Sequence, residues 1–87
     1  MDLISFEQLK LMEHTIGFEP NRVKGSKYKA YRNYFCAGSN EMKEFEDLIT
    51  KGMAVRDIRS GYIYYFLTDK GINYLSEVTD VKIIEMD

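Results

Sequence analysis

The sequence predicts one small α+β domain with about three helices and a small antiparallel β-sheet or hairpin. Three observations support this class. Apolar residues recur at helical spacing in three segments, two β-rich runs flank a short glycine-containing turn, and 87 residues can bury only one core. The composition is 45% hydrophobic and 30% charged with a single proline, which is typical of a folded globule. We therefore expect residues 1–87 to form a single domain.

The first predicted helix covers residues 6–16. Ser5 and Gln8 have the spacing of a capping box, in which each side chain bonds the backbone N–H of the other residue. One apolar stripe is expected from residues spaced by three, three and four positions: Phe6, Leu9, Met12 and Ile16.

Two further stretches complete the first half of the chain. Residues 18–27 contain Pro20, Gly25 and little periodicity, which predicts a surface loop that we expect to be flexible. Residues 28–37 fit either a helical face or one face of a strand. Their aromatic enrichment favours an extended segment that ends at Gly38.

The second predicted helix begins at a cap supplied by Ser39 or Asn40 and ends at Gly52. Its buried stripe is expected to contain Met42, Phe45, Leu48 and Ile49.

Residues 53–58 and 62–67 are β-rich runs joined by a short turn over 59–61, which predicts a hairpin. The second run is apolar on both faces, so we expect it to lie centrally or to show rings to a partner. Thr68 caps a third helix, whose buried stripe is expected to hold Ile72, Leu75 and Val78. The tail, residues 79–87, includes an apolar stretch over 81–86 that would add an edge strand or pack on another subunit.

Residues 41–78 combine an amphipathic helix, Gly52, a hairpin and a Leu67-Thr68-Asp69-Lys70-Gly71 segment that opens a helix. This order resembles the second half of a winged-helix domain. The chain with its segment Tyr31-Arg32-Asn33-Tyr34-Phe35 also resembles small uncharacterised phage and prophage proteins. The first resemblance implies a winged-helix-like domain, and the second implies a phage or prophage source with a bacterial host.

Two departures from the winged-helix pattern bear on function. A standard winged-helix domain has a helix-turn-helix before the wing, whereas residues 17–38 show no clear second helix. The helix in the recognition position, residues 41–51, also carries more acids than bases: Glu41, Glu44, Glu46 and Asp47 against Lys43 and Lys51. Acids would repel phosphate in a major groove, so this helix is a poor reader of DNA.

Positive charge is concentrated in one segment of the chain. Residues 20–40 hold five bases and no acid, which leaves seven bases and fourteen acids elsewhere. Aromatic residues interleave with these bases, namely Tyr28, Tyr31, Tyr34 and Phe35, and this composition suits contacts with phosphate, sugar and unstacked bases. Two arginines at the hairpin turn could also contact a groove. The predicted nucleic-acid contacts are Arg22, Lys24, Lys27, Lys29, Tyr31, Arg32, Arg56 and Arg59. The competing interpretation is that these cations solvate a loop while the rings fill the core.

We expect no catalysis, cofactor, metal or small-molecule substrate. His14 and Cys36 could form a nucleophile and base pair, but no third orienting residue accompanies them. One cysteine and one histidine are also too few for a zinc site.

Two functions remain. The first is a non-catalytic binding module that contacts nucleic acid through the basic aromatic segment. The second is a protein-interaction or assembly module that forms a homo-oligomer through the strand at 62–67 or through the tail. The sequence has no long apolar run or recognisable signal peptide, so a cytoplasmic location without membrane contact is expected.

Overall fold

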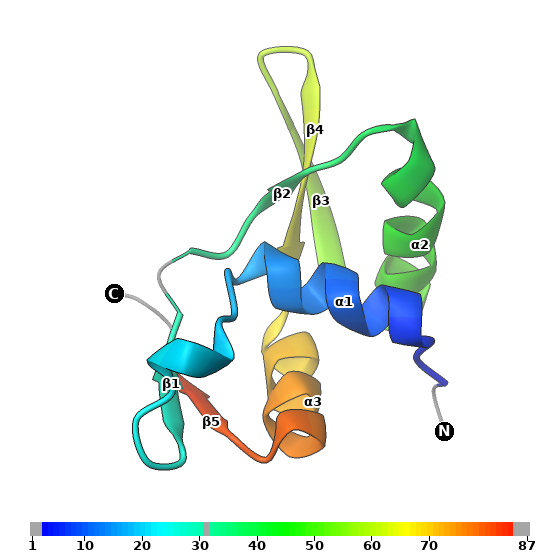
Figure 1. The fold of residues 1–87 in the computed structure, drawn as a ribbon. Coiled ribbons are helices and arrows are strands. Elements are labelled where there is room, and N and C mark those ends of the chain that lie inside the picture. The colour runs from blue at the N-terminus through cyan, green and yellow to red at the C-terminus, as the bar shows by residue number, and fades with distance from the viewer. Residues whose placement is uncertain (1–2, 31, 85–87) are drawn as a thin grey trace.

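The computed structural model describes residues 3–30 and 32–84 and confirms a small α+β fold of helices and two small sheets (Figure 1). In chain order the elements are α1 (Phe6–Thr15), a 3₁₀ turn η1 (Pro20–Arg22), β1 (Lys27–Lys29), β2 (Phe35–Cys36), α2 (Ser39–Thr50), β3 (Ala54–Arg59), β4 (Tyr62–Leu67), α3 (Asp69–Thr79) and β5 (Lys82–Ile84).

The larger sheet is antiparallel and has the strand order β2–β4–β3, so β4 lies centrally as one of the two alternatives predicted. Strands β3 and β4 form a hairpin that projects beyond the helices (Figure 1). Ser60 and Gly61 connect them with positive φ angles of 52° and 81°, the conformation that a two-residue hairpin turn requires. This turn sets the register in which Arg59 faces Tyr62.

The smaller sheet pairs β1 with β5 in parallel, at the opposite end of the molecule from the hairpin tip (Figure 1). Residues 82–84 of the tail therefore bind within their own chain, and Ile83 is buried between β1 and α3. This outcome agrees with the predicted edge strand. Residues 85–87 of the tail lie outside the described residues.

Helices cover one face of the larger sheet. The ring of Phe45 in α2 stacks on Tyr65 of β4 with the centroids 4.6 Å apart and the planes 8° from parallel. Side chains from nearly every element are buried around this pair: Met12, Ile16, Tyr28, Ala30, Phe45, Leu48, Met53, Ala54, Tyr65, Leu67, Ile72, Leu75 and Ile83. Each large apolar side chain buried in this way contributes about 1.5–3 kcal/mol before the entropy cost of ordering it.

The ends of two predicted stripes are wrong. Phe6 is 73% exposed and Val78 is 47% exposed. Because a helix turns by about 100° per residue, two successive steps of three residues rotate a side chain about 120° from the start of the stripe. Two such steps separate Phe6 from Met12 and Ile72 from Val78. Phe6 and Val78 therefore face away from the core, whereas Met12 and Ile72 face into it.

Residues close in sequence cap the starts of α1 and α2. The Ser5 hydroxyl accepts from Gln8 N at 3.0 Å and the Gln8 side chain accepts from Ser5 N at 3.1 Å, so the predicted capping box is confirmed. The cap of α2 is Gly38 and not Ser39 or Asn40, both of which lie inside the helix. Glu41 accepts from the Gly38 N–H at 3.3 Å, so the backbone donor of the cap residue is satisfied from within the helix.

A close backbone contact requires the glycine of the Leu-Thr-x-x-Gly segment. Thr68 caps α3 by accepting from Gly71 N at 3.2 Å, and its hydroxyl donates to the Gly52 carbonyl at 2.7 Å. A Cβ at position 71 would lie only 2.3 Å from the backbone oxygen of Met53. Only glycine therefore fits where the start of α3 contacts the chain that leaves α2.

The segment from Arg32 to Phe35 joins three elements. Arg32 Nη2 donates to the His14 carbonyl at 2.7 Å, near the end of α1. The Asn33 side chain exchanges two hydrogen bonds with the backbone of Leu67 in β4, and the ring of Phe35 lies 5.0 Å from that of Phe45. Between α1 and α2 the described residues contain η1, β1 and β2 but no α-helix, so no helix-turn-helix is formed by them.

Candidate nucleic-acid interface

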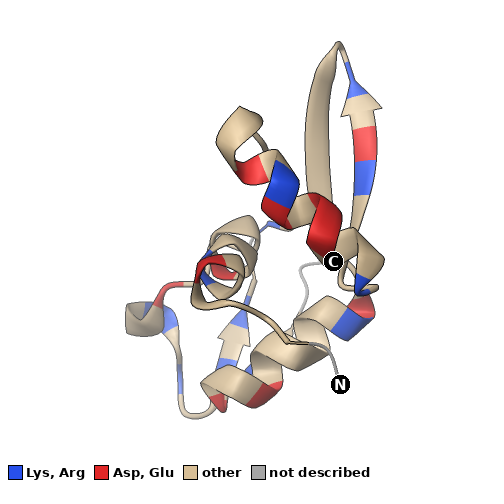
Figure 2. Cartoon of the chain, turned by 90° about the vertical axis from the view of Figure 1, so that its right-hand side faces the viewer, with Lys and Arg blue, Asp and Glu red and all other residues tan. Residues whose placement is uncertain are grey.

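A groove with a basic lining runs along β1 and the loop before it. It has a volume of about 560 Å³, and we call it the basic groove; its lining residues are Asn21, Arg22, Lys24, Lys27, Lys29 and Ile84. Figure 2 shows the positive segments following one another through this loop and strand. None of the described lining residues is acidic, so four of the eight residues predicted from sequence meet at one concave surface.

Strand alternation directs the lysines outward. Lys27 and Lys29 are exposed, whereas Tyr28 between them is only 2% exposed. The Tyr28 hydroxyl donates to the Gly17 carbonyl at 2.5 Å, and its ring packs edge-on against Phe18 with the centroids 4.9 Å apart. Because the Tyr28 anchor prevents the strand from rotating, both ammonium groups must face solvent.

A tight turn places Lys24 opposite Lys27. The two residues exchange backbone hydrogen bonds, from Lys24 N to Lys27 O at 2.9 Å and from Lys27 N to Lys24 O at 3.1 Å. Gly25 in the turn has a φ of 64°, which glycine adopts without strain. The predicted surface loop therefore contains a hydrogen-bonded turn that holds two cations together.

Lys82 is a fifth cation that sequence reasoning missed. Parallel pairing makes it the register partner of Lys27, and Ser26 O accepts from its backbone N–H at 2.7 Å. Paired like charges are unfavourable in a sheet, so this arrangement favours binding of an anion. Lys82 also lines a second hollow together with Glu77 and Asp80. These two acids mark the limit of the basic surface on that side.

The lysines of the basic groove have no carboxylate partners in the described part of the chain. Lys24, Lys27 and Lys29 form no ion pair within 4.0 Å among residues 3–30 and 32–84. Their charges are therefore available to an external anion. The nucleic-acid interpretation requires unpaired cations of this kind, and cations that only solvate a loop would look the same.

The two hairpin arginines differ from these lysines. Arg56 Nη1 lies 2.7 Å from Glu46 Oε2 of α2, and Arg59 Nε lies 2.7 Å from Asp57 Oδ2. The hydrogen bond that Arg56 donates to the Glu46 carboxylate raises the pKa of Arg56. Neither arginine lines the basic groove. Arg56 is on the face of β3 that meets α2, so it ties the hairpin to the helix.

The expected mixture of cations and exposed rings does not form at the basic groove. Tyr28 was expected to contribute a ring there but is buried by strand alternation. Tyr34 is 49% exposed but lies on the larger sheet, where its ring centroid is 6.4 Å from that of Tyr64. Tyr31 lies outside the described residues. No ring therefore lines the basic groove among the described residues.

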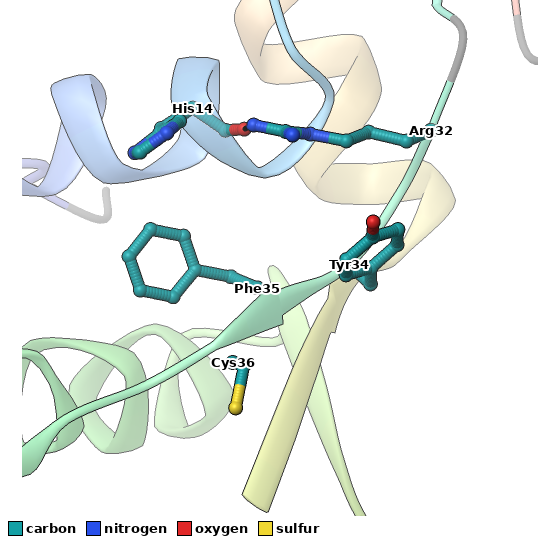
Figure 3. Close-up of a pocket in the computed structure, with 5 residues that line it drawn as sticks. All are labelled: His14, Arg32, Tyr34, Phe35 and Cys36. Carbon is teal, nitrogen blue, oxygen red and sulfur yellow. Dashed lines mark hydrogen bonds between the residues drawn. The ribbon is translucent and has the colours of Figure 1, made fainter.

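Arg32 lines a small hollow together with His14, Tyr34, Phe35 and Cys36 (Figure 3). The ring of Phe35 lies between His14 and Cys36 and packs edge-on against the imidazole with the centroids 5.2 Å apart. The Cys36 thiol points away from His14 (Figure 3). The nucleophile and base pair considered from the sequence is therefore not in contact.

Comparisons add no assignment: no protein-family model, curated protein or solved structure matches the chain. Within residues 3–30 and 32–84, no cluster of three His, Cys, Asp or Glu side chains is placed to hold a metal ion. In the same residues, no helix has both the length and the apolar character needed to cross a membrane.

Proposed function

We propose that this chain is a non-catalytic binding module that contacts the phosphate backbone of nucleic acid through the basic groove. One observation carries the proposal. Lys24, Lys27 and Lys29 converge on a concave surface with no described acidic lining, and Lys82 adds a fourth lysine beside Lys27. Phosphates spaced along a strand supply the repeated negative charge that such a row of cations neutralises.

The same geometry indicates which surface does not bind. The chain carries a net charge of −2, so attraction depends on the local field of the basic groove and not on total charge. Helix α2 carries acids over much of its length (Figure 2) and would be repelled by phosphate. The proposed module is winged-helix-like in its helix, hairpin and helix order, but it contacts nucleic acid through β1 and not through α2. By the resemblance given above, we place it among phage or prophage proteins that act in the cytoplasm of a bacterial host.

Binding through lysines predicts little sequence preference. A lysine ammonium is a point charge that neutralises phosphate, whereas base recognition needs planar or paired donors aimed at base edges. Each phosphate contact lowers the slope of log K against log salt by about 0.7 for a single strand and about 0.9 for a duplex. Four or five contacts therefore predict a slope of about −3 to −3.5 for a single strand and about −3.5 to −4.5 for a duplex.

The test is a charge reversal. The Lys27→Glu and Lys29→Glu double variant should abolish binding to a fluorescein-labelled 20-nucleotide DNA, measured by anisotropy between 50 and 200 mM salt. The Lys10→Glu and Lys43→Glu double variant is a matched control, because it makes the same change in net charge on exposed faces of α1 and α2. Equal affinity in the groove variant and the wild type would refute the proposal. An equal loss in both variants would show that only net charge matters.

A further inference from the structure

The face of the larger sheet opposite the helices carries a group of aromatic rings. We call it the outer aromatic face; its rings belong to Tyr34, Tyr62, Tyr64 and Phe66. Alternation along β4 places Tyr62, Tyr64 and Phe66 opposite Tyr65 and Leu67, which point into the core, and the Tyr34 ring lies beside Tyr64. Tyr62 is 62% exposed, and Tyr64 and Phe66 are half-buried. The described helices pack on the other face, so these rings remain accessible in the described part of the chain.

Three of the rings, those of Tyr34, Tyr64 and Phe66, line a hollow that also contains a cation. Its volume is about 380 Å³, and its lining residues are Tyr34, Arg59, Ser60, Tyr64 and Phe66. The Arg59 guanidinium lies 5.5 Å from the Phe66 ring centroid, and the Arg32 guanidinium lies 5.8 Å from that of Tyr34. The carboxylate of Asp57 on this face is bound by Arg59. Flat apolar walls with arginines at the edge suit a planar ring attached to an anionic group.

We infer that the outer aromatic face stacks unpaired bases of a single strand whose phosphates lie in the basic groove. The inference rests on the proposed function and names its ligand as single-stranded nucleic acid. Bases in a duplex already stack on their neighbours, so a protein ring can stack fully only on an unpaired base. Alternate residues of β4 lie about 6.6 Å apart along the strand, so successive rings can meet successive splayed bases.

A short stretch of chain separates the two surfaces, and the inference requires one nucleic-acid strand to span it. Lys29 in the basic groove and Tyr34 on the outer aromatic face are five residues apart in the chain. A fully extended segment of that length spans at most about 18 Å. The chain between β1 and β2 connects the two sheets directly (Figure 1), and Arg32 on this connection lies beside the Tyr34 ring. Cations thus continue from the groove toward the rings, which favours a nucleic-acid strand over an apolar protein surface as the occupant.

Ring removal tests the inference separately from the proposed function. The Tyr34→Leu and Tyr64→Leu double variant keeps apolar bulk but removes two stacking surfaces. We expect its affinity for a 20-nucleotide oligo-dT to fall by about 10- to 100-fold, with the salt slope and the affinity for a 20-base-pair duplex unchanged. Tyr74→Leu on α3 is the matched control, because Tyr74 is a half-buried tyrosine outside the outer aromatic face. Circular dichroism establishes that each variant is folded.

Cys36 supplies a second readout in the wild-type chain. It is the only cysteine, it is exposed, and its register partner is Tyr64, so it borders the outer aromatic face. Saturating oligo-dT should slow its reaction with a thiol reagent by at least about fivefold, whereas the duplex should not.

The outcomes separate the two claims. Oligo-dT binding that is lost on groove charge reversal, but unchanged by the leucine variant and without Cys36 protection, would overturn the stacking inference and keep the proposed function. Absence of any nucleic-acid binding would overturn both. A dimer in sedimentation velocity, with Cys36 protected before nucleic acid is added, would show that a second copy covers this face and would also overturn the inference.

Discussion

Asn33 completes the larger sheet with its side chain, and its removal should strongly destabilise the fold. Its Nδ2 donates to the Leu67 carbonyl at 3.0 Å, and its Oδ1 accepts from the Leu67 N–H at 2.8 Å. The amide thus replaces the peptide group that a longer β2 would offer to β4. Leu67 is only 4% exposed, so both of its backbone groups depend on this partner or on water that reaches the site.

Asn33→Ala should lower the free energy of unfolding by about 2–4 kcal/mol, because it leaves two backbone groups of a buried residue without partners at about 1–3 kcal/mol each. Water can offset part of that cost because Asn33 is half-buried. The total stability expected for 87 residues is about 4–13 kcal/mol, so the loss is a large share of it. The corresponding fall in Tm is about 10–25 °C.

Urea unfolding followed by circular dichroism measures this loss. Asn73→Ala is the matched control, because Asn73 is an exposed asparagine on α3 and its substitution should change stability by less than about 0.5 kcal/mol. Asn33→Asp separates the two bonds: it keeps the acceptor for Leu67 N but places a carboxylate oxygen against Leu67 O. It should therefore be less stable than wild type at pH 7 and regain stability when the carboxyl is protonated. If Asn33→Ala were as stable as Asn73→Ala, the paired bonds would not support the sheet.

Two further predictions concern α3 and α2. Gly71→Ala should destabilise the chain by about 1–3 kcal/mol in urea unfolding, because its Cβ would lie 2.3 Å from Met53 O. Gly38→Ala, with its nearest atom at 3.5 Å, has no such clash and should cost only the smaller amount by which alanine is a poorer N-cap than glycine. A gain in stability for Gly71→Ala, as the better helix propensity of alanine would give, would contradict the close contact. The hydrogen bonds from Tyr65 and Arg56 lower the pKa of Glu46, so its contribution to stability is present above its unfolded pKa of about 4.3 and is lost as pH falls through the lower folded pKa. Glu46→Gln should therefore reduce the acid dependence of the urea midpoint between pH 5 and 2, and an unchanged dependence would contradict this role.

Predictions from short spacings were the most successful. The Ser5 and Gln8 capping box, the hairpin between β3 and β4, and the Thr68 cap each depend on residues within a few positions of one another. Local hydrogen bonds and turn geometry are encoded where they act, so a sequence pattern is sufficient. The failures at Phe6 and Val78 came from steps of three residues that drift off a helical face.

The candidate site likewise combines features that local sequence determines with features that depend on long-range packing. Sequence alone determined that positive charge is concentrated in residues 20–40 and that the strand at 62–67 is apolar on both faces. Only the tertiary structure brought Lys82 beside Lys27 across 55 positions, turned the Tyr28 ring inward and bound Arg56 to Glu46. These contacts depend on which elements far apart in the chain pack together. A local residue pattern predicts a strand but not the strand with which it pairs. Composition therefore located the charge, whereas packing decided which cations face a common groove.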